Sequence, residues 1–242
     1  MVVADLDGGA AETVAAEIGG IPVAVDVADE RTLTGMIESV EVDVGAIDLF
    51  VSNAGVGYGD ADGLAASAGG GMIAVDDRWE LCWRINVLAH VVAARVLVPK
   101  MLARGGGWFV NVASAAGLLS QIGDAAYSAT KHAAVAFAES LAITHGEDGI
   151  RVSVVCPQAV ATRMIGIDDD SGSLDGGFGG NDVDGVIRPE EVADQVIDGI
   201  EQGRFLILPH PQVATYVQRK ANDHDRWIRG MQRFRRTLAS GD

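Results

Sequence analysis

The sequence predicts a doubly wound α/β fold with a parallel central sheet, and three observations carry this prediction. Short β-branched runs alternate with longer stretches of helical periodicity, which is the order of repeated βα units. Most of the short runs are continuously apolar, as in strands buried on both faces of a parallel sheet. The chain of 242 residues is long enough to bury a large core, so we expect a single domain over 1–242.

The elements follow one another from the N-terminus in a regular order. Strand-like runs lie at 1–7, 21–29, 48–55, 108–117, 150–158 and 204–210. Helical spacing of apolar residues separates most of them, at 8–19, 30–43, 76–103, 124–145 and 189–202. Segments rich in Gly and Asp near 57–71 and 166–185 follow strand ends, and we expect flexible loops there. An amphipathic pattern near 211–239 predicts a C-terminal helix that breaks near "NDHD".

Charge and cysteine content exclude several classes of protein. The net charge of −16 argues against nucleic-acid binding, because a duplex-binding surface needs clustered Lys and Arg. From Arg204 onward the chain has eight basic and three acidic residues, so this C-terminal part is basic while the rest of the chain is acidic. Cys82 and Cys156 have no metal-like partner at short spacing, and we expect two buried thiols, no metal site and a cytoplasmic location. Neither an export signal nor a membrane span is predicted.

The most specific motif is "YSATK", which places Tyr127 and Lys131 four residues apart. On a helix they share a face, so the lysine ammonium can lie near the phenol. A nearby cation lowers the pKa of a tyrosine from about 10, as a general base for an alcohol requires. An ordinary helical pair is the alternative interpretation.

Two further polar residues precede this motif. Ser114 ends a predicted strand thirteen residues before Tyr127, where a hydroxyl can donate to a substrate oxygen or can simply cap a turn. Asn86 lies inside a long helical pattern, where asparagine is mildly unfavourable unless its side chain has a function.

Together with "SNAG" at 52–55, these residues resemble the catalytic tetrad and strand-four motif of the short-chain dehydrogenase/reductase family, a Rossmann-type fold. The resemblance covers nearly the whole chain and implies a catalytic set of Asn86, Ser114, Tyr127 and Lys131. Tyr127 would exchange a proton with the substrate oxygen that Ser114 holds. Lys131 would bind the nicotinamide ribose and lower the tyrosine pKa, and Asn86 would hold a water.

The same resemblance implies NAD as cofactor, which supplies the hydride. The implied cofactor-binding residues are Asp5, Asp26, Val27, Asn53, Ala54, Gly55, Tyr127, Lys131, Pro157, Val160 and Thr162. An acid at the end of strand two binds both adenosine ribose hydroxyls in this family and disfavours NADP. Asp7 is the better helix cap by position, which leaves Asp5 for the ribose, although either residue can be only a cap.

Three features depart from the family pattern. Pro157 is followed by Gln158 where relatives have Pro-Gly, and the last strand lacks the usual Asp-Gly-Gly. The first strand and the TGxxxGxG turn, which cradles the cofactor pyrophosphate, are missing before Met1. We expect a start codon assigned too late, with a genuine truncation as the rival. Loss of this central strand should leave two strands separated from the sheet or force the sheet to close up.

The expected function is oxidation of a secondary alcohol, or reduction of the matching ketone, by a homodimer or homotetramer that pairs through the helices at 76–103 and 124–145. A non-catalytic truncated member that cannot bind a dinucleotide and acts as an oligomeric or interaction protein is the alternative. An epimerase or dehydratase of the longer branch is a third candidate, although the chain is short for its substrate domain.

Overall fold

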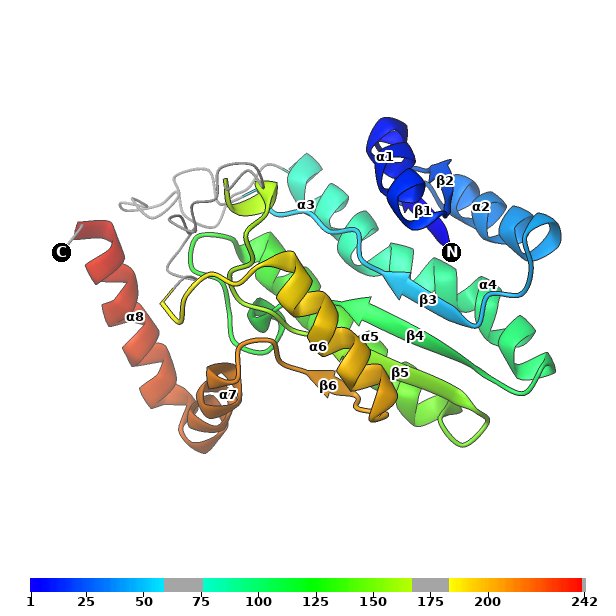
Figure 1. Cartoon of the computed structure of the whole chain (residues 1–242). Helices are drawn as coiled ribbons and strands as arrows, with labels where there is room; N and C mark the ends of the chain where they lie inside the picture. Colours follow the sequence, from blue (N-terminus) through cyan, green and yellow to red (C-terminus); the bar gives the residue numbers. More distant parts are fainter. Residues whose placement is uncertain (59–75, 167–182, 241–242) are drawn as a thin grey trace.

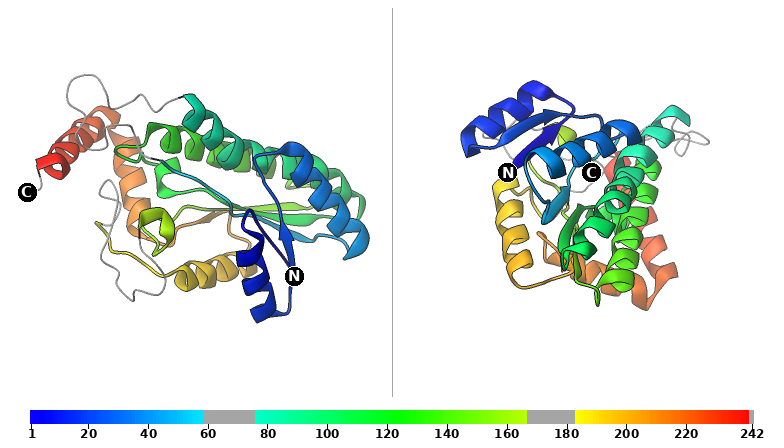
Figure 2. Two further views of the ribbon diagram at one scale, coloured as in Figure 1. Left: turned by 90° about the horizontal axis from the view of Figure 1, so that it is seen from above. Right: turned by 90° about the vertical axis from the view of Figure 1, so that its right-hand side faces the viewer.

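The computed structural model describes residues 1–58, 76–166 and 183–240, and shows parallel strands flanked by helices on both faces (Figures 1 and 2). Both predicted loops, near 57–71 and 166–185, fall largely outside the described residues. The strands are β1 (Val2–Asp5), β2 (Ile21–Ala24), β3 (Leu49–Ser52), β4 (Gly107–Val112), β5 (Ile150–Val155) and β6 (Leu206–Ile207). The α-helices are α1 (Gly8–Ile18), α2 (Glu30–Asp43), α3 (Asp76–Trp83), α4 (Ala89–Ala103), α5 (Ala125–His145), α6 (Pro189–Glu201), α7 (Gln212–Asn222) and α8 (His224–Ser240). All predicted strands and helices are found.

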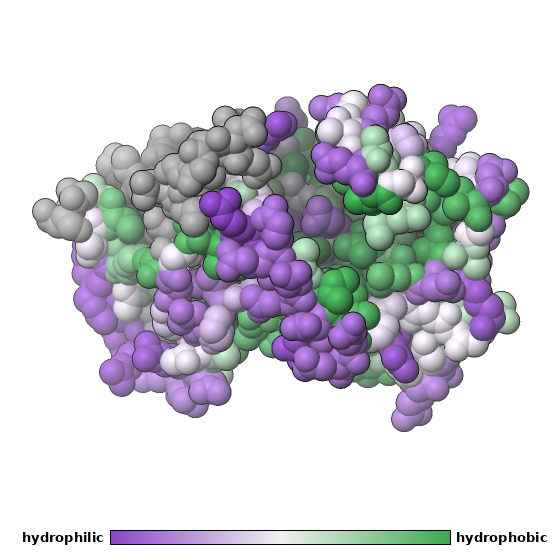
Figure 3. Space-filling view, viewed as in Figure 1, coloured by the Kyte–Doolittle hydropathy of each residue, from purple (hydrophilic) through white to green (hydrophobic). Residues whose placement is uncertain are grey.

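The strands form two separate parallel sheets rather than one. β1 pairs with β2, and the second sheet has the order β3-β4-β5-β6. β1 and β3 therefore each have one unpaired edge within the described residues, and both line the same cavity. The surface between them is hollowed and apolar (Figure 3). Of the two expected outcomes, the structure shows the separated strands.

Strand burial follows this division. Five of the six residues of β5 and three of the six of β4 are buried, so the prediction of burial on both faces fits β5 best. The prediction is wrong for β1, β2 and β3, which have no buried side chain. The physical reason for β1 and β3 is their open edge, because a strand without a neighbour on one side leaves its side chains accessible there.

Helices cover the larger sheet from both sides, with α4 and α5 on one face and α6 on the other (Figure 2). The main core joins α2, α4, α5, β4 and β5 and includes Leu33, Ile37, Leu97 and Phe109. A smaller core under α6 contains Val110, Val155 and Ile207. This packing fixes the carboxyl ends of β4 and β5, where ligands bind in this architecture.

The predicted helix at 76–103 is continuous but not uniform, because a π-helical turn, η2 (Arg84–Leu88), separates α3 from α4. Asp77–Ala103 is long and apolar enough to cross a membrane by length and composition alone. More than half of its most apolar stretch is buried inside the protein. It packs here as a core helix.

The C-terminal segment forms α7 and α8, and the chain turns between them at Asp223, which has an extended backbone (φ −154°, ψ 92°). The Asp223 carboxylate accepts a hydrogen bond from the Arg226 backbone N–H at 2.8 Å and so caps α8. The predicted break near "NDHD" is confirmed.

Candidate active site

Tyr127 and Lys131 lie in the first two turns of α5 and share one face, as the spacing predicts. The Lys131 Nζ atom is 5.5 Å from the centroid of the Tyr127 ring. Lys131 is buried, and its ammonium donates to the Val112 carbonyl oxygen at the end of β4 (3.0 Å). The pair is therefore held against the carboxyl edge of the sheet.

Asp124 fixes the start of α5, and sequence reasoning did not single it out. Its buried side chain accepts hydrogen bonds from the backbone N–H groups of Tyr127 (2.9 Å) and Tyr58 (3.0 Å). One carboxylate thus caps the helix and ties down the segment after β3. An aspartate three residues before Tyr127, at the predicted start of a helix, was the available signal.

Ser114 follows β4 and adopts the capping role considered for it, while its role toward a substrate oxygen stays a prediction. Its Oγ accepts from the Ala116 backbone N–H (3.1 Å), which caps the short turn η3 (Ala115–Gly117), and donates to the Pro157 carbonyl oxygen (3.4 Å). Ser114 also lines the cavity together with Tyr127.

Asn86 lies in the π-helical turn, a geometry that is frequent at functional sites. Its amide accepts from the Val56 backbone N–H (2.9 Å) and donates to the Val56 carbonyl (2.9 Å) and to Thr130 Oγ1 (3.0 Å). Asn86 therefore joins α5 to the segment after β3. Its water-holding role stays a prediction.

Gly55 lies where these groups converge. A Cβ atom at this position would be 3.1 Å from Lys131 Nζ and 3.4 Å from Asn86 Oδ1. A larger side chain would displace the lysine or the asparagine, so the last residue of "SNAG" must be small for the set to assemble.

The pKa of Tyr127 differs from the expected direction. Burial raises it above the ordinary value near 10, the Ser114 hydroxyl beside the phenol partly offsets this, and the Asp124 charge adds to the increase. Burial also lowers the pKa of Lys131 to about 8, so its ammonium stays mostly protonated at neutral pH. Lys131 is not among the groups that lower the pKa of Tyr127 in this structure, and its expected effect on that pKa stays a prediction.

One cavity of about 1850 Å³ brings most of the predicted site residues together. Of these residues, its lining includes Asp5, Asp26, Val27, Asn53, Ala54, Gly55, Ser114, Tyr127, Lys131, Pro157, Val160 and Thr162. Asn86 is fully buried behind it. Among the described residues, no group of three His, Cys, Asp or Glu side chains could hold a metal ion.

The cavity fits the two nucleoside ends of a dinucleotide better than its pyrophosphate. Asp5 lines it, and the Asp5 carboxylate accepts only from the Asp7 backbone N–H (2.9 Å) among the hydrogen bonds described. Asp7 caps α1 by accepting from Gly9 and Ala10, as predicted. Because the Asp7 carboxylate already occupies the N-terminus of α1, this helix offers no site for the pyrophosphate. Elsewhere in the described ranges, no glycine-rich turn joins a strand to a helix.

The turn after β5 carries the side chain that replaces the usual glycine. The Gln158 backbone N–H donates to His210 Nδ1 (3.1 Å). Gln158 Oε1 and His210 Nε2 are buried without a hydrogen-bond partner among the described atoms. Elsewhere at the cavity, His90 is buried near the Asn111 side chain, and burial together with the Lys131 charge lowers the pKa of His90 to about 4.

Comparison with known proteins places the chain among dehydrogenases. Residues 1–170 match the family described as short chain dehydrogenase. The chain is 30% identical over 231 residues to 1-deoxy-11-beta-hydroxypentalenate dehydrogenase of Streptomyces exfoliatus, covering 92% of this chain and 78% of the relative. It is 35% identical over 165 residues to "Inactive 2-(S)-hydroxypropyl-CoM dehydrogenase 2" of Xanthobacter autotrophicus, covering 67% of each protein.

A solved structure of a short chain dehydrogenase/reductase from Burkholderia phymatum in complex with NAD superposes with a TM-score of 0.73 at 25% identity. The alignment covers 93% of this chain and 84% of that one.

Proposed function

The chain belongs to the short-chain dehydrogenase/reductase family, and from this premise we propose that it is an NAD-dependent oxidoreductase that interconverts a secondary alcohol and a ketone. The observation that carries the proposal is the convergence of Ser114, Tyr127 and Lys131 at the carboxyl ends of β4 and β5, on one cavity. Ligands bind at this edge in open α/β sheets.

Each of these side chains has a role that its contacts allow. Tyr127 holds the transferable proton on its phenol oxygen, and the raised pKa keeps that proton in place at neutral pH, which suits donation to a ketone oxygen. Ser114 would hold the substrate oxygen, because its side chain lines the cavity and Ala116 fixes its position; its single hydroxyl proton would then turn from the Pro157 carbonyl to the substrate. When bound, the nicotinamide cofactor supplies or accepts the hydride.

The protein's own residues would hold the cofactor at its two ends. Asp5 would accept from the adenosine ribose hydroxyls, which favours NAD over NADP because a 2′-phosphate would meet its charge. Asp26 and Val27 would contact adenine, and Asn53, Ala54 and Gly55 would shape the ribose pocket. Lys131 would bind the nicotinamide ribose. Pro157, Val160 and Thr162, which also line the cavity, would contact the carboxamide and phosphate.

The test compares Tyr127→Phe with the wild type in NAD-dependent turnover of a panel of secondary alcohols. We expect a loss of about 10²–10⁴-fold in kcat, because the phenylalanine has no transferable proton. NADH binding, measured by nicotinamide fluorescence, should remain nearly unchanged, since the substitution removes little cofactor contact. Substantial residual turnover would show that Tyr127 is not the acid-base group.

The second candidate is a non-catalytic family member. The separation of the β1-β2 sheet from the β3-β4-β5-β6 sheet favours it. A protein whose two sheets stay apart, as they do in the described residues, would keep the outer helices of the fold and act through protein contacts. Absence of NADH binding at millimolar concentration, in a protein with a cooperative unfolding transition, would support this alternative over the enzyme.

We also propose a homodimer or homotetramer in the cytoplasm. Trp83, Leu88 and Ile143 are exposed on α3, η2 and α5, the helices predicted to pair between subunits. Light scattering at micromolar concentration tests this directly, and a well-folded monomer would contradict it.

A further inference from the structure

The cavity continues beyond Ser114 and Tyr127 to a wall built by α7 and α8. Val213 of α7 is fully buried against Ala115 and Leu119, in the segment that follows Ser114. The Lys220 ammonium donates to the carbonyl oxygens of Leu118 (2.8 Å) and Leu119 (2.9 Å). These contacts hold α7 on the active-site segment, so its cavity-lining side chains belong to the same site as Ser114.

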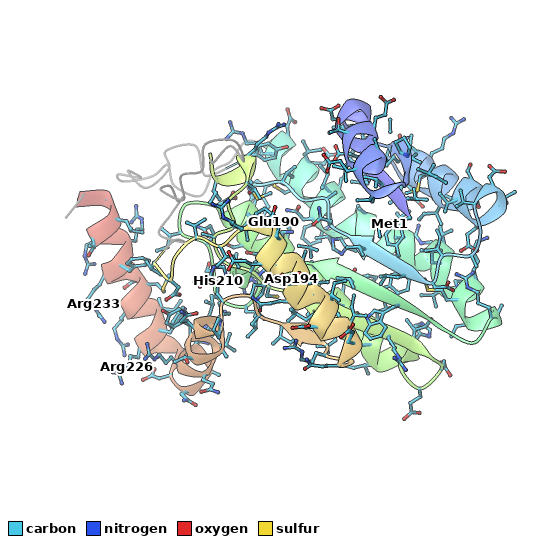
Figure 4. All side chains as sticks on the ribbon, viewed as in Figure 1. Met1, Glu190, Asp194, His210, Arg226 and Arg233 are labelled. Carbon is cyan, nitrogen blue, oxygen red and sulfur yellow. The ribbon has the colours of Figure 1, made fainter. Side chains whose placement is uncertain are left out.

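The apolar part of this wall comes from α8. Trp227, Met231 and Phe234 are spaced by four and three residues, share one helix face and line the cavity. Arg226 and Arg233 lie on α8 away from α6 and are exposed (Figure 4). The helix thus presents hydrocarbon to the cavity and charge to solvent.

One cation of α7 also lines the cavity. The Arg219 guanidinium is exposed and lies 5.8 Å from the centroid of the Tyr216 ring. The Tyr216 hydroxyl donates to Asp184 Oδ1 (2.9 Å), which fixes the ring beside the guanidinium. Within the described part of the chain, no carboxylate lies within 4.0 Å of Arg219. A guanidinium placed this way presents a planar fork of donors that matches a carboxylate.

We propose that Arg219 binds an anionic group of the substrate, while the Trp227, Met231 and Phe234 face of α8 contacts its hydrocarbon body. The substrate class that this site would take is a secondary alcohol or ketone with an apolar skeleton and a carboxylate. This substrate assignment rests on the proposed function, whereas the binding site itself needs only the geometry of α7 and α8.

Ligand binding tests the site without any turnover. The probes are octanoate and 1-octanol, which have eight-carbon chains and differ in the charged group, and the readout is calorimetric titration at low ionic strength, with tryptophan fluorescence as a second signal. We expect octanoate to bind the wild type about tenfold more tightly than octanol. Arg219→Met should remove this preference and leave octanol affinity unchanged, because a charge-assisted hydrogen bond is lost. Arg219→Lys should restore part of it.

Two matched arginines make the result specific. Arg226→Met changes an exposed arginine of α8 outside the cavity and should not alter either affinity. Arg163 is the other arginine that lines the cavity, and Arg163→Met should leave the octanoate preference intact. Equal affinities in the wild type, or a preference that survives Arg219→Met or disappears with Arg163→Met, would overturn the proposal. Because binding is measured without cofactor, failure of the Tyr127 test would refute the enzymatic function and not this site.

Discussion

The residues before α2 and the residues around β4 and β5 are built from similar sequence patterns but are packed differently. In the N-terminal unit, β1-α1-β2, the only buried side chains are Ala11 and Ala15 of α1. In the catalytic half, α4, α5, β4 and β5 share one continuous core. The catalytic side chains stand on the packed half, and Asp5 stands on the half with an open edge. The positions of the catalytic side chains are therefore fixed more firmly by packing than the position of Asp5 in the proposed cofactor site.

The largest expected effect separates the two regions by stability. Leu97→Ala removes a side chain that is 0% exposed in the main core and should lower the free energy of unfolding by about 2–5 kcal/mol. Val14→Ala in α1 changes a side chain that is 46% exposed and should shift stability by less than about 0.5 kcal/mol. Urea denaturation measures both. Equal losses would mean that the N-terminal unit contributes as much packing as the catalytic half.

The next prediction addresses the cofactor side. An extended chain, in which an apolar strand, a TGxxxGxG turn and a helix precede Met1, should bind NADH at least about a hundredfold more tightly than the 242-residue chain. Two charge-assisted hydrogen bonds to the pyrophosphate contribute about 1.5–3 kcal/mol each, which exceeds the required 2.7 kcal/mol or so.

Calorimetric titration of both chains with NADH decides this prediction. The control is an extended chain whose turn glycines are replaced by alanine, in which the strand is present but the phosphate contact is disturbed. If the 242-residue chain binds as tightly as the extended one, the phosphate site is built elsewhere.

A third prediction concerns the pH dependence of the catalytic half. Burial lowers the pKa of His90 to about 4 in the folded state, below the ordinary value of 6.5, so the unfolded chain binds the proton more readily. The contribution of His90 is therefore constant above pH 6.5, and stability is lost as the pH falls from 6.5 toward 4. Between pH 7.5 and 5 the loss should be about 2 kcal/mol, since each unit of pKa difference is worth about 1.36 kcal/mol.

Urea denaturation of His90→Leu at pH 7.5 and pH 5 isolates the contribution of His90 to the free energy of unfolding, because leucine cannot titrate. The substitution should remove about 2 kcal/mol of the pH dependence, while His224→Gln, at the exposed start of α8, should retain it. An unchanged pH dependence in His90→Leu would show that the histidine is solvated or partnered in solution.

Sequence patterns predicted local features well and long-range packing less well. The helix and strand order, the shared face of Tyr127 and Lys131, the Asp7 cap and the break before α8 all depend on neighbouring residues, and the structure confirms them. The exposure of β3 and the raised pKa of Tyr127 depend on which distant segments cover them, which no local pattern records. Asp124 and Arg219 were missed because single charged residues at helix positions are common on protein surfaces.

The smallest expected effect compares two valines that are neighbours on adjacent strands, one on the edge strand β3 and one on the inner strand β4. Val51 of β3 and Val110 of β4 are partners in register, yet Val51 is 48% exposed and Val110 is 0% exposed. Val110→Ala should therefore cost about 2 kcal/mol of stability, whereas Val51→Ala should cost less than about 0.5 kcal/mol in the 242-residue chain. In the extended chain a strand beside β3 would cover Val51, and the cost of Val51→Ala should rise toward that of Val110→Ala. Denaturation of the four variants measures the change, and a Val51 cost that is the same in both chains would show that the added strand does not occupy the space between β1 and β3.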